Sequence, residues 1–244
     1  MNETKWWSKL FIFSAGICLF LLVAGPLGYK FGISDLLPSL VTLLVALVGA
    51  VIVVAGSLIM LVVANKNGLV KDRNLLVAAV VISIIPVVIM APQIGTARSV
   101  PLIHDVSTDT NEPPEFVMIA ALRENAPNSL VYEFEGSASK LAEMQSAAYP
   151  DVKTLMSKLP VEEAVERAVS LLVEQGLELI SVDKDRGIVE ATATTFWFGF
   201  KDDVVVRVRP DSTGSRIDVR SISRVGQSDV GVNAARILKF TNAF

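Results

Sequence analysis

Three uncharged, strongly apolar runs within the first 92 residues constrain the fold more than any other feature. They cover about residues 10–28, 39–64 and 74–91. A helix needs about 20 predominantly apolar residues to cross the hydrocarbon core of a bilayer. Residues 1–92 are therefore predicted to form a membrane anchor of three transmembrane helices. Because no ionisable residue interrupts the runs, the sequence predicts an anchor without an ion or proton pathway.

Basic residues in the short flanking segments predict the orientation of the anchor. Cytoplasmic loops of membrane proteins carry an excess of Lys and Arg. Lys5 and Lys9 precede the first run, whereas the connection over residues 29–38 holds one lysine and one aspartate. The next connection is basic again and contains Lys66, Lys71 and Arg73. We therefore expect a bacterial inner (cytoplasmic) membrane protein with a cytoplasmic N-terminus and a periplasmic or extracytoplasmic C-terminal domain.

Charge is distributed unevenly along the chain and excludes one class of partner. Residues 101–244 hold 15 of the Lys and Arg residues and 22 of the Asp and Glu residues, a net charge of −7. Nucleic-acid binding relies on basic residues that neutralise phosphates. No nucleic-acid partner is expected. The single cysteine, Cys18, lies inside the first apolar run, so no intramolecular disulfide can form.

Residues 93–159 are polar, proline-bearing and weakly periodic, which predicts an extended linker or arm with short helices. One helix is expected from about Ser137 to Ala148. The only histidine, His104, lies near Asp105 and Asp109. These three could ligate a metal, but Asp, Ser and Thr at this density favour turns, and zinc sites usually take three or four protein ligands. No metal and no cofactor are expected.

Residues 160–244 show clear periodicity. Apolar residues recur at helical spacing between Pro160 and Gly176, which predicts an amphipathic helix. Strands are predicted over residues 177–182, 188–195, 203–209 and 216–223, followed by a helix over 232–240 that Ser228 or Asp229 caps. The predicted fold class is α+β. Three N-terminal transmembrane helices precede a small antiparallel four-stranded sheet with helices packed on one face.

The last two predicted strands alternate between apolar and charged residues. Val206 and Val208 alternate with Arg207 on one strand, and Ile217 alternates with Asp218 on the next. This pattern predicts that one face of the sheet is wet or covered only by polar groups. A turn over residues 210–214 would place Arg207 opposite Asp218 as a cross-strand ion pair.

Four aromatic residues around one glycine, between the second and third strands, exceed what a hairpin connection needs. They are Phe196, Trp197, Phe198 and Phe200. Such residues can form a ligand pocket, dock a partner or enter a membrane interface. They can equally fold back and close the open end of the sheet. The pattern supports both interpretations.

Charged residues gather near the end of the fourth strand and on the final helix. Arg220, Arg224, Asp229 and Arg236 could bind an anion such as a lipid or sugar phosphate, because guanidinium groups match phosphate oxygens. A network of surface salt bridges is the favoured alternative, since exposed ion pairs are common.

A catalytic interpretation is also open. It would use His104 with Asp105 and Asp109, together with Asp202 and Asp203, as a polar site. However, adjacent strand residues such as Asp202 and Asp203 point to opposite faces. We therefore expect a membrane-anchored envelope protein, in lipid contact through its three spans, whose outward domain binds a protein, lipid or glycan partner without catalysis. A periplasmic hydrolase-like enzyme is the alternative.

Several long segments resemble one bacterial family. They are residues 103–117 (IHDVSTDTNEPPEFV), 147–151 (AAYPD), 191–203 (ATATTFWFGFKDD) and 215–229 (SRIDVRSISRVGQSD). In this order they are similar to the domain of unknown function 1499. The resemblance covers most of residues 101–244, and members with a three-span leader also occur. It implies no activity, cofactor or catalytic residue.

Overall fold

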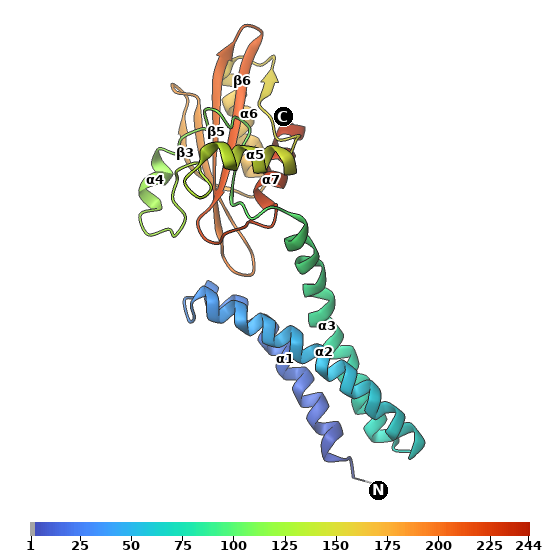
Figure 1. The fold of residues 1–244 in the computed structure, drawn as a ribbon. Coiled ribbons are helices and arrows are strands. Elements are labelled where there is room, and N and C mark those ends of the chain that lie inside the picture. Colours follow the sequence, from blue (N-terminus) through green and yellow to red (C-terminus); the bar gives the residue numbers. More distant parts are fainter. Residues whose placement is uncertain (1–2) are drawn as a thin grey trace. The chain divides into compact units, whose positions relative to one another are not determined.

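A computed structural model of the chain describes residues 3–244. The chain divides into two compact units. One comprises Met1–Ala97 with Trp197–Gly199, and the other comprises Arg98–Phe196 with Phe200–Phe244. Figure 1 shows the helices of the first unit and the mixed helices and strands of the second.

The first unit contains three long helices, α1 (Trp6–Lys30), α2 (Leu36–Lys66) and α3 (Val70–Ser99). Each is long and apolar enough to cross a membrane. Each helix extends past the predicted apolar run at both ends. Hydropathy marks the part of a helix suited to lipid, whereas the backbone hydrogen bonds that define the helix continue into polar flanks.

Glycines allow α1 and α2 to approach closely. A Cβ atom at Gly49 would lie 2.9 Å from the sulfur of Cys18, and one at Gly56 would lie 2.5 Å from the ring of Phe11. Small residues permit such contacts in helix pairs of membrane proteins. The start of α3 joins the bundle through Asp72, whose carboxylate accepts a hydrogen bond from the Ser8 hydroxyl at 2.6 Å.

The second unit is built on an antiparallel sheet whose four longer strands match the prediction. They are β3 (Glu178–Asp183), β4 (Ile188–Thr194), β5 (Lys201–Asp211) and β6 (Gly214–Ser223). These strands pair in sequence order, and Arg207 lies opposite Asp218 as predicted. The helix α6 (Val161–Glu174) follows Pro160, as the sequence indicated.

The sheet has six strands, so the prediction of four is wrong. The two additional strands are β1 (Asp105–Ser107) and β2 (Leu155–Ser157), and both pair antiparallel with β6. Each is only three residues long, too short for the alternation that reveals a strand. The arm therefore belongs to the same sheet as residues 160–244.

Helices contact both faces of the sheet, whereas the sequence predicted one face. The main core lies under α6 and α7 (Val232–Ala243), with side chains from α5 (Ala138–Ala148). On the opposite face, Ile119 of α4 (Met118–Leu122) packs with Phe116, Val205 and Ile222. This face carries the candidate site. The predicted helix over Ser137 to Ala148 is confirmed as α5, which Ser137 caps.

Candidate functional site

A polar face of the sheet carries the site. Alternate residues of β5 and β6 point away from the α6 and α7 core, because successive side chains of a strand point to opposite faces. The charged residues on this face include Asp203, Arg207, Arg209, Arg216, Asp218 and Arg220. The sequence predicted a wet face, or one covered only by polar groups. The arm covers it with apolar side chains as well, since Phe116 and Ile119 pack there.

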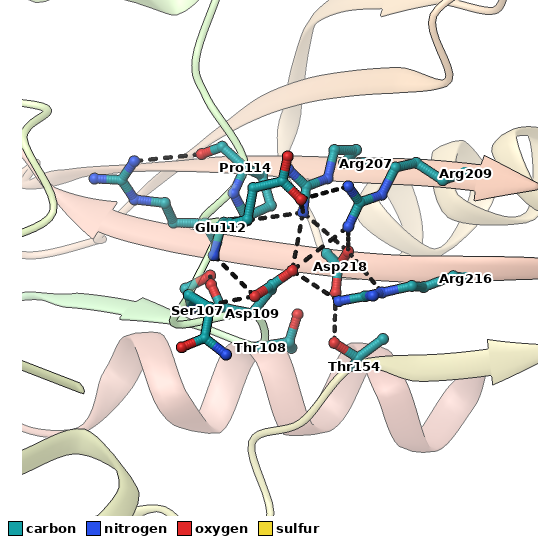
Figure 2. Close-up of polar contacts among 12 residues, drawn as sticks. Ser107, Thr108, Asp109, Glu112, Pro114, Thr154, Arg207, Arg209, Arg216 and Asp218 are labelled. Carbon is teal, nitrogen blue, oxygen red and sulfur yellow. Dashed lines mark hydrogen bonds and ion pairs between the residues drawn. The ribbon is translucent and has the colours of Figure 1, made fainter. Parts of the chain in front are cut away.

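Three arginines converge on two carboxylates on this face (Figure 2). Asp218 is fully buried and accepts hydrogen bonds at 3.1 Å from both Arg207 and Arg209. Arg216 donates to Asp109 at 2.7 Å and Arg207 donates to it at 3.3 Å. The predicted cross-strand pair of Arg207 and Asp218 is thus confirmed, within a larger cluster. We name Arg207, Arg209, Arg216, Asp109 and Asp218 the arginine cluster.

A tight turn of the arm brings Asp109 to the sheet. The Ser107 hydroxyl donates to the backbone oxygen of Asp109, and the Asp109 carboxylate accepts from the backbone N–H groups of Asn111 and Glu112. This is the Asx turn that the sequence predicted for the segment. Glu112 then reaches back, and its carboxylate accepts from Arg209 at 2.6 Å. The hydrogen bond from Arg209 lowers the pKa of Glu112 below its usual value.

Arg220 lies further along β6, and its guanidinium group donates several hydrogen bonds. It makes a two-point ion pair with Asp105, at 3.0 Å and 2.6 Å. Its remaining donors reach the backbone oxygens of Pro114 and Leu130. Burial raises the pKa of Asp105, an effect that the paired guanidinium opposes. The predicted anion-binding role of Arg220 stays a prediction. In the structure its N–H groups form hydrogen bonds with residues of the arm.

A pocket of about 450 Å³ opens beside Arg220. The aromatic rings of Phe116 and Tyr132 line it, and each ring centroid lies 5.5 Å from the guanidinium carbon of Arg220. Leu130 and Val131 complete its apolar wall. This volume lies within the range of small-molecule binding sites, about 300–1,000 Å³. The Arg220–Asp105 pair fixes the wall in place.

Gln145 of α5 secures the arm from the other side. Its side-chain oxygen accepts from the backbone N–H of Ser107 at 2.8 Å, and its nitrogen donates to the backbone oxygen of the same residue at 2.7 Å. The Tyr132 hydroxyl also donates to this side-chain oxygen, at 3.1 Å. A single amide thus joins α5, β1 and one wall of the pocket.

A second buried ion-pair group surrounds Asp203. Its carboxylate accepts from Arg224 at two points, each 2.8 Å long, and from Arg123 at 2.8 Å. Thr192 donates to it as well, at 2.7 Å. Burial lowers the pKa of Arg123. Arg224 lies near the end of β6, as the sequence predicted. Its hydrogen-bond partners come from the sheet and from the arm.

The other predicted charged residues lie on the opposite face or at its end. Arg236 of α7 donates to Asp202 at 2.7 Å. Asp202 and Asp203 thus point to opposite faces, as predicted. Asp229 accepts from the backbone N–H groups of Gly231 and Asn233, and burial raises its pKa. The N-cap residue of α7 is Gly231, two residues beyond the predicted position, although the Asp229 side chain supplies the hydrogen bonds.

The predicted aromatic residues lie in the β4–β5 connection, and none of them is among the residues that line the pocket. Hydrogen bonds between Thr195 and Phe200 close the base of this loop, and Gly199 supplies a positive φ of 67°. Phe196 and Trp197 are 75% and 53% exposed, whereas Phe198 and Phe200 are half-buried. Their proposed role in ligand or partner binding stays a prediction.

The residues of the predicted polar site are not brought together. Asp105 pairs with Arg220, Asp109 belongs to the arginine cluster, and Asp202 lies on the opposite face. His104 contributes its backbone oxygen, which accepts from Ser223 and Asn233. Over residues 3–244, no hydrogen bond joins the His104 side chain to a carboxylate. The hydrolase-like alternative stays a prediction.

Sequence reasoning missed the arm residues that build the pocket and its supports. Phe116, Tyr132, Arg123 and Gln145 come from segments without clear periodicity. The alternation of charges along β5 and β6 did signal that oppositely charged partners were needed. It could not show which residues of the arm supply them.

Comparison with known proteins gives one finding. Among the curated proteins and among the solved structures, no match is found. The family model described as a protein of unknown function (DUF1499) matches residues 105–244, more than half of the chain. This segment contains the sheet, the arginine cluster and the pocket. The chain therefore belongs to the family of proteins of unknown function DUF1499.

Proposed function

We propose that the chain is a membrane-anchored binding protein of the bacterial envelope, whose C-terminal domain docks a partner protein without catalysis. The pocket receives an apolar side chain of that partner. It is lined by Pro113, Glu115, Phe116, Leu130, Val131, Tyr132 and Arg220. The single observation that carries the proposal is this preformed aromatic pocket of about 450 Å³.

The surroundings of the pocket favour a protein over the lipid and glycan alternatives. Val131 on its wall is 60% exposed, and Val117 and Met118 beside Phe116 are 40% and 57% exposed. Protein interfaces combine a buried aromatic anchor site with adjoining apolar side chains. Asp105, the buried carboxylate beside the pocket, does not resemble a general base, because both of its oxygens accept hydrogen bonds from Arg220. This supports docking over hydrolysis.

The proposed location is the outer side of the cytoplasmic membrane, with the N-terminus inside. Three helices are long and apolar enough to span, and an odd number of spans places the two chain ends on opposite sides. The basic connection between α2 and α3 holds Lys66, Lys71 and Arg73. The preference of cytoplasmic loops for such residues supports this orientation.

Cysteine labelling tests the orientation. In a Cys18→Ser background, Ser212→Cys in the β5–β6 turn is expected to react with a membrane-impermeant maleimide in cells whose outer membrane is permeabilised. Asn67→Cys, in the connection between α2 and α3, should react only after the inner membrane is disrupted. The reverse pattern would show that the domain faces the cytoplasm.

Photocrosslinking tests the docking surface. A benzoylphenylalanine at Val131 of the full chain in native membranes is expected to capture one protein. The matched control is the same substitution at Val173 of α6, which is 53% exposed but lies outside the pocket. Met118→Asp should weaken the capture by about tenfold, because a charge at an apolar contact is costly to bury.

The outcomes separate the classes of partner. Capture of one protein from Val131, lost in Met118→Asp and absent from Val173, supports the proposal. Capture of lipid or glycan alone would replace the protein partner with that class. Equal capture from Val131 and Val173 would contradict a specific docking surface.

A further inference from the structure

The arginine cluster has a charge arrangement that the fold alone does not require. Its three guanidinium groups surround the two buried carboxylates of Asp109 and Asp218, which leaves one positive charge in excess. Glu112 supplies the third carboxylate. Its side chain is 68% exposed, whereas that of Asp218 is fully buried. Of the three carboxylates, the one that balances the third positive charge is thus the only one exposed to solvent.

The outer arginines present binding capacity toward solvent. The side chains of Arg209 and Arg216 are 32% and 38% exposed. Inside the cluster, the Nε–H group of Arg207 is buried without a hydrogen bond, whereas the Nε atom of Arg216 lies 3.4 Å from Asp218 as an ion pair. A buried donor without an acceptor costs free energy, about 1–3 kcal/mol. Donors therefore exceed acceptors in this cluster.

We infer that Arg207, Arg209 and Arg216 form a binding site for an external carboxylate, and that Glu112 occupies this site as an internal substitute. Figure 2 shows the Glu112 carboxylate opposite the guanidinium group of Arg209. The inference goes beyond the proposed docking function, since the arginine cluster lies outside the residues that line the pocket.

The side chain of Glu112 can leave while its backbone stays in place. The Asp109 carboxylate holds the backbone N–H of Glu112 at 3.0 Å, and Arg207 donates to the backbone oxygen of Glu112 at 2.8 Å. Only the contacts of the Glu112 carboxylate need to be exchanged, namely its hydrogen bond to Arg209 and its 4.0 Å ion pair with Arg207. Rotation of one exposed side chain therefore opens the site without unfolding the arm.

The chemistry of the occupant indicates the chemistry of the ligand. Glu112 presents a planar carboxylate of single negative charge, which matches the planar fork of a guanidinium group. A ligand carboxylate restores the neutral balance that Glu112 provides. It can belong to an acidic side chain of a polypeptide or to a small organic acid.

Calorimetric titration of the full chain in a non-ionic detergent tests the inference. The probes are a hexaglutamate peptide, succinate and inorganic phosphate. Glu112→Gln removes the internal competitor, so the hexaglutamate peptide is expected to bind this variant about tenfold more tightly than the unaltered chain. The matched control is Glu124→Gln, which changes the net charge equally at an exposed residue of the arm outside the cluster.

A second variant identifies the site. Adding Arg209→Gln to Glu112→Gln should abolish the tenfold gain, because Arg209 is the guanidinium group that holds the Glu112 carboxylate. Asp218 keeps Arg207 and Arg216 as partners in this double variant. Hydrogen exchange of β5 and β6 peptides shows whether the sheet remains folded.

Each outcome is informative. A gain for both the peptide and succinate supports a site for any carboxylate, and a gain for the peptide alone supports an acidic polypeptide. Equal affinity in the unaltered chain and in Glu112→Gln would overturn the inference, as would an equal gain in Glu124→Gln. Tighter binding of phosphate than of either carboxylate would overturn the assignment to carboxylates. Photocrosslinking at Val131 is independent of all these results.

Discussion

Asp203→Ala is expected to lower the free energy of unfolding of the C-terminal domain by about 3–5 kcal/mol. The Asp203 side chain is fully buried and accepts hydrogen bonds from Arg123, Arg224 and Thr192. The Arg123 side chain is only 3% exposed. Without Asp203, this guanidinium remains buried without a compensating charge, which accounts for most of the cost.

Urea unfolding of the full chain in detergent, followed by hydrogen exchange of peptides from β4 to β6, measures this loss. A suitable control is Glu135→Gln, which breaks the ion pair between Glu135 and Lys140. Both of these side chains are about half exposed or more. Exposed pairs contribute little, so this control should unfold like the unaltered chain. A small effect of Asp203→Ala would show that Arg123 finds solvent when its partner is removed.

Phe240→Ala is expected to cost a similar amount, about 3–5 kcal/mol, through a different mechanism. Phe240 of α7 is 1% exposed and belongs to the main core. Its removal leaves a cavity between α7 and the sheet, and lost contacts add to the lost burial. Hydrogen exchange of α7 peptides in a urea series measures the change.

Phe244 provides the matched control for this core position. It is half-buried at the end of the chain, and its ring centroid lies 5.7 Å from that of Phe240. Phe244→Ala removes the same number of atoms from a less enclosed site, so its cost should be clearly smaller. Equal costs would indicate that the two rings act as one packing unit.

Much of the fold was predictable because periodic patterns of apolar residues indicate its helices and strands. The apolar runs predicted α1 to α3, and the stripe between Pro160 and Gly176 predicted α6. The turn after Arg209 fixed the register of β5 and β6, and this register placed Arg207 opposite Asp218. In each case the signal lies within about ten to twenty neighbouring residues.

The arm was not predictable because its contacts are distant in sequence. β1 and β2 are three residues long, and they become strands only because β6 offers them backbone partners. Asp105 and Asp109 looked like turn residues or metal ligands, yet each lies against an arginine of the sheet. A charged residue on a strand shows that a partner is needed, but the identity of that partner depends on the tertiary fold.

The amide of Gln145 has a consequence for how neighbouring copies of the domain meet. β1 forms an edge of the sheet, and unpaired backbone groups on an edge strand can recruit a strand from another chain. At Ser107 the outward N–H and C=O already bind Gln145, so no incoming backbone can use them. The Gln145 side chain therefore protects the β1 edge of the sheet against pairing with a strand of another copy.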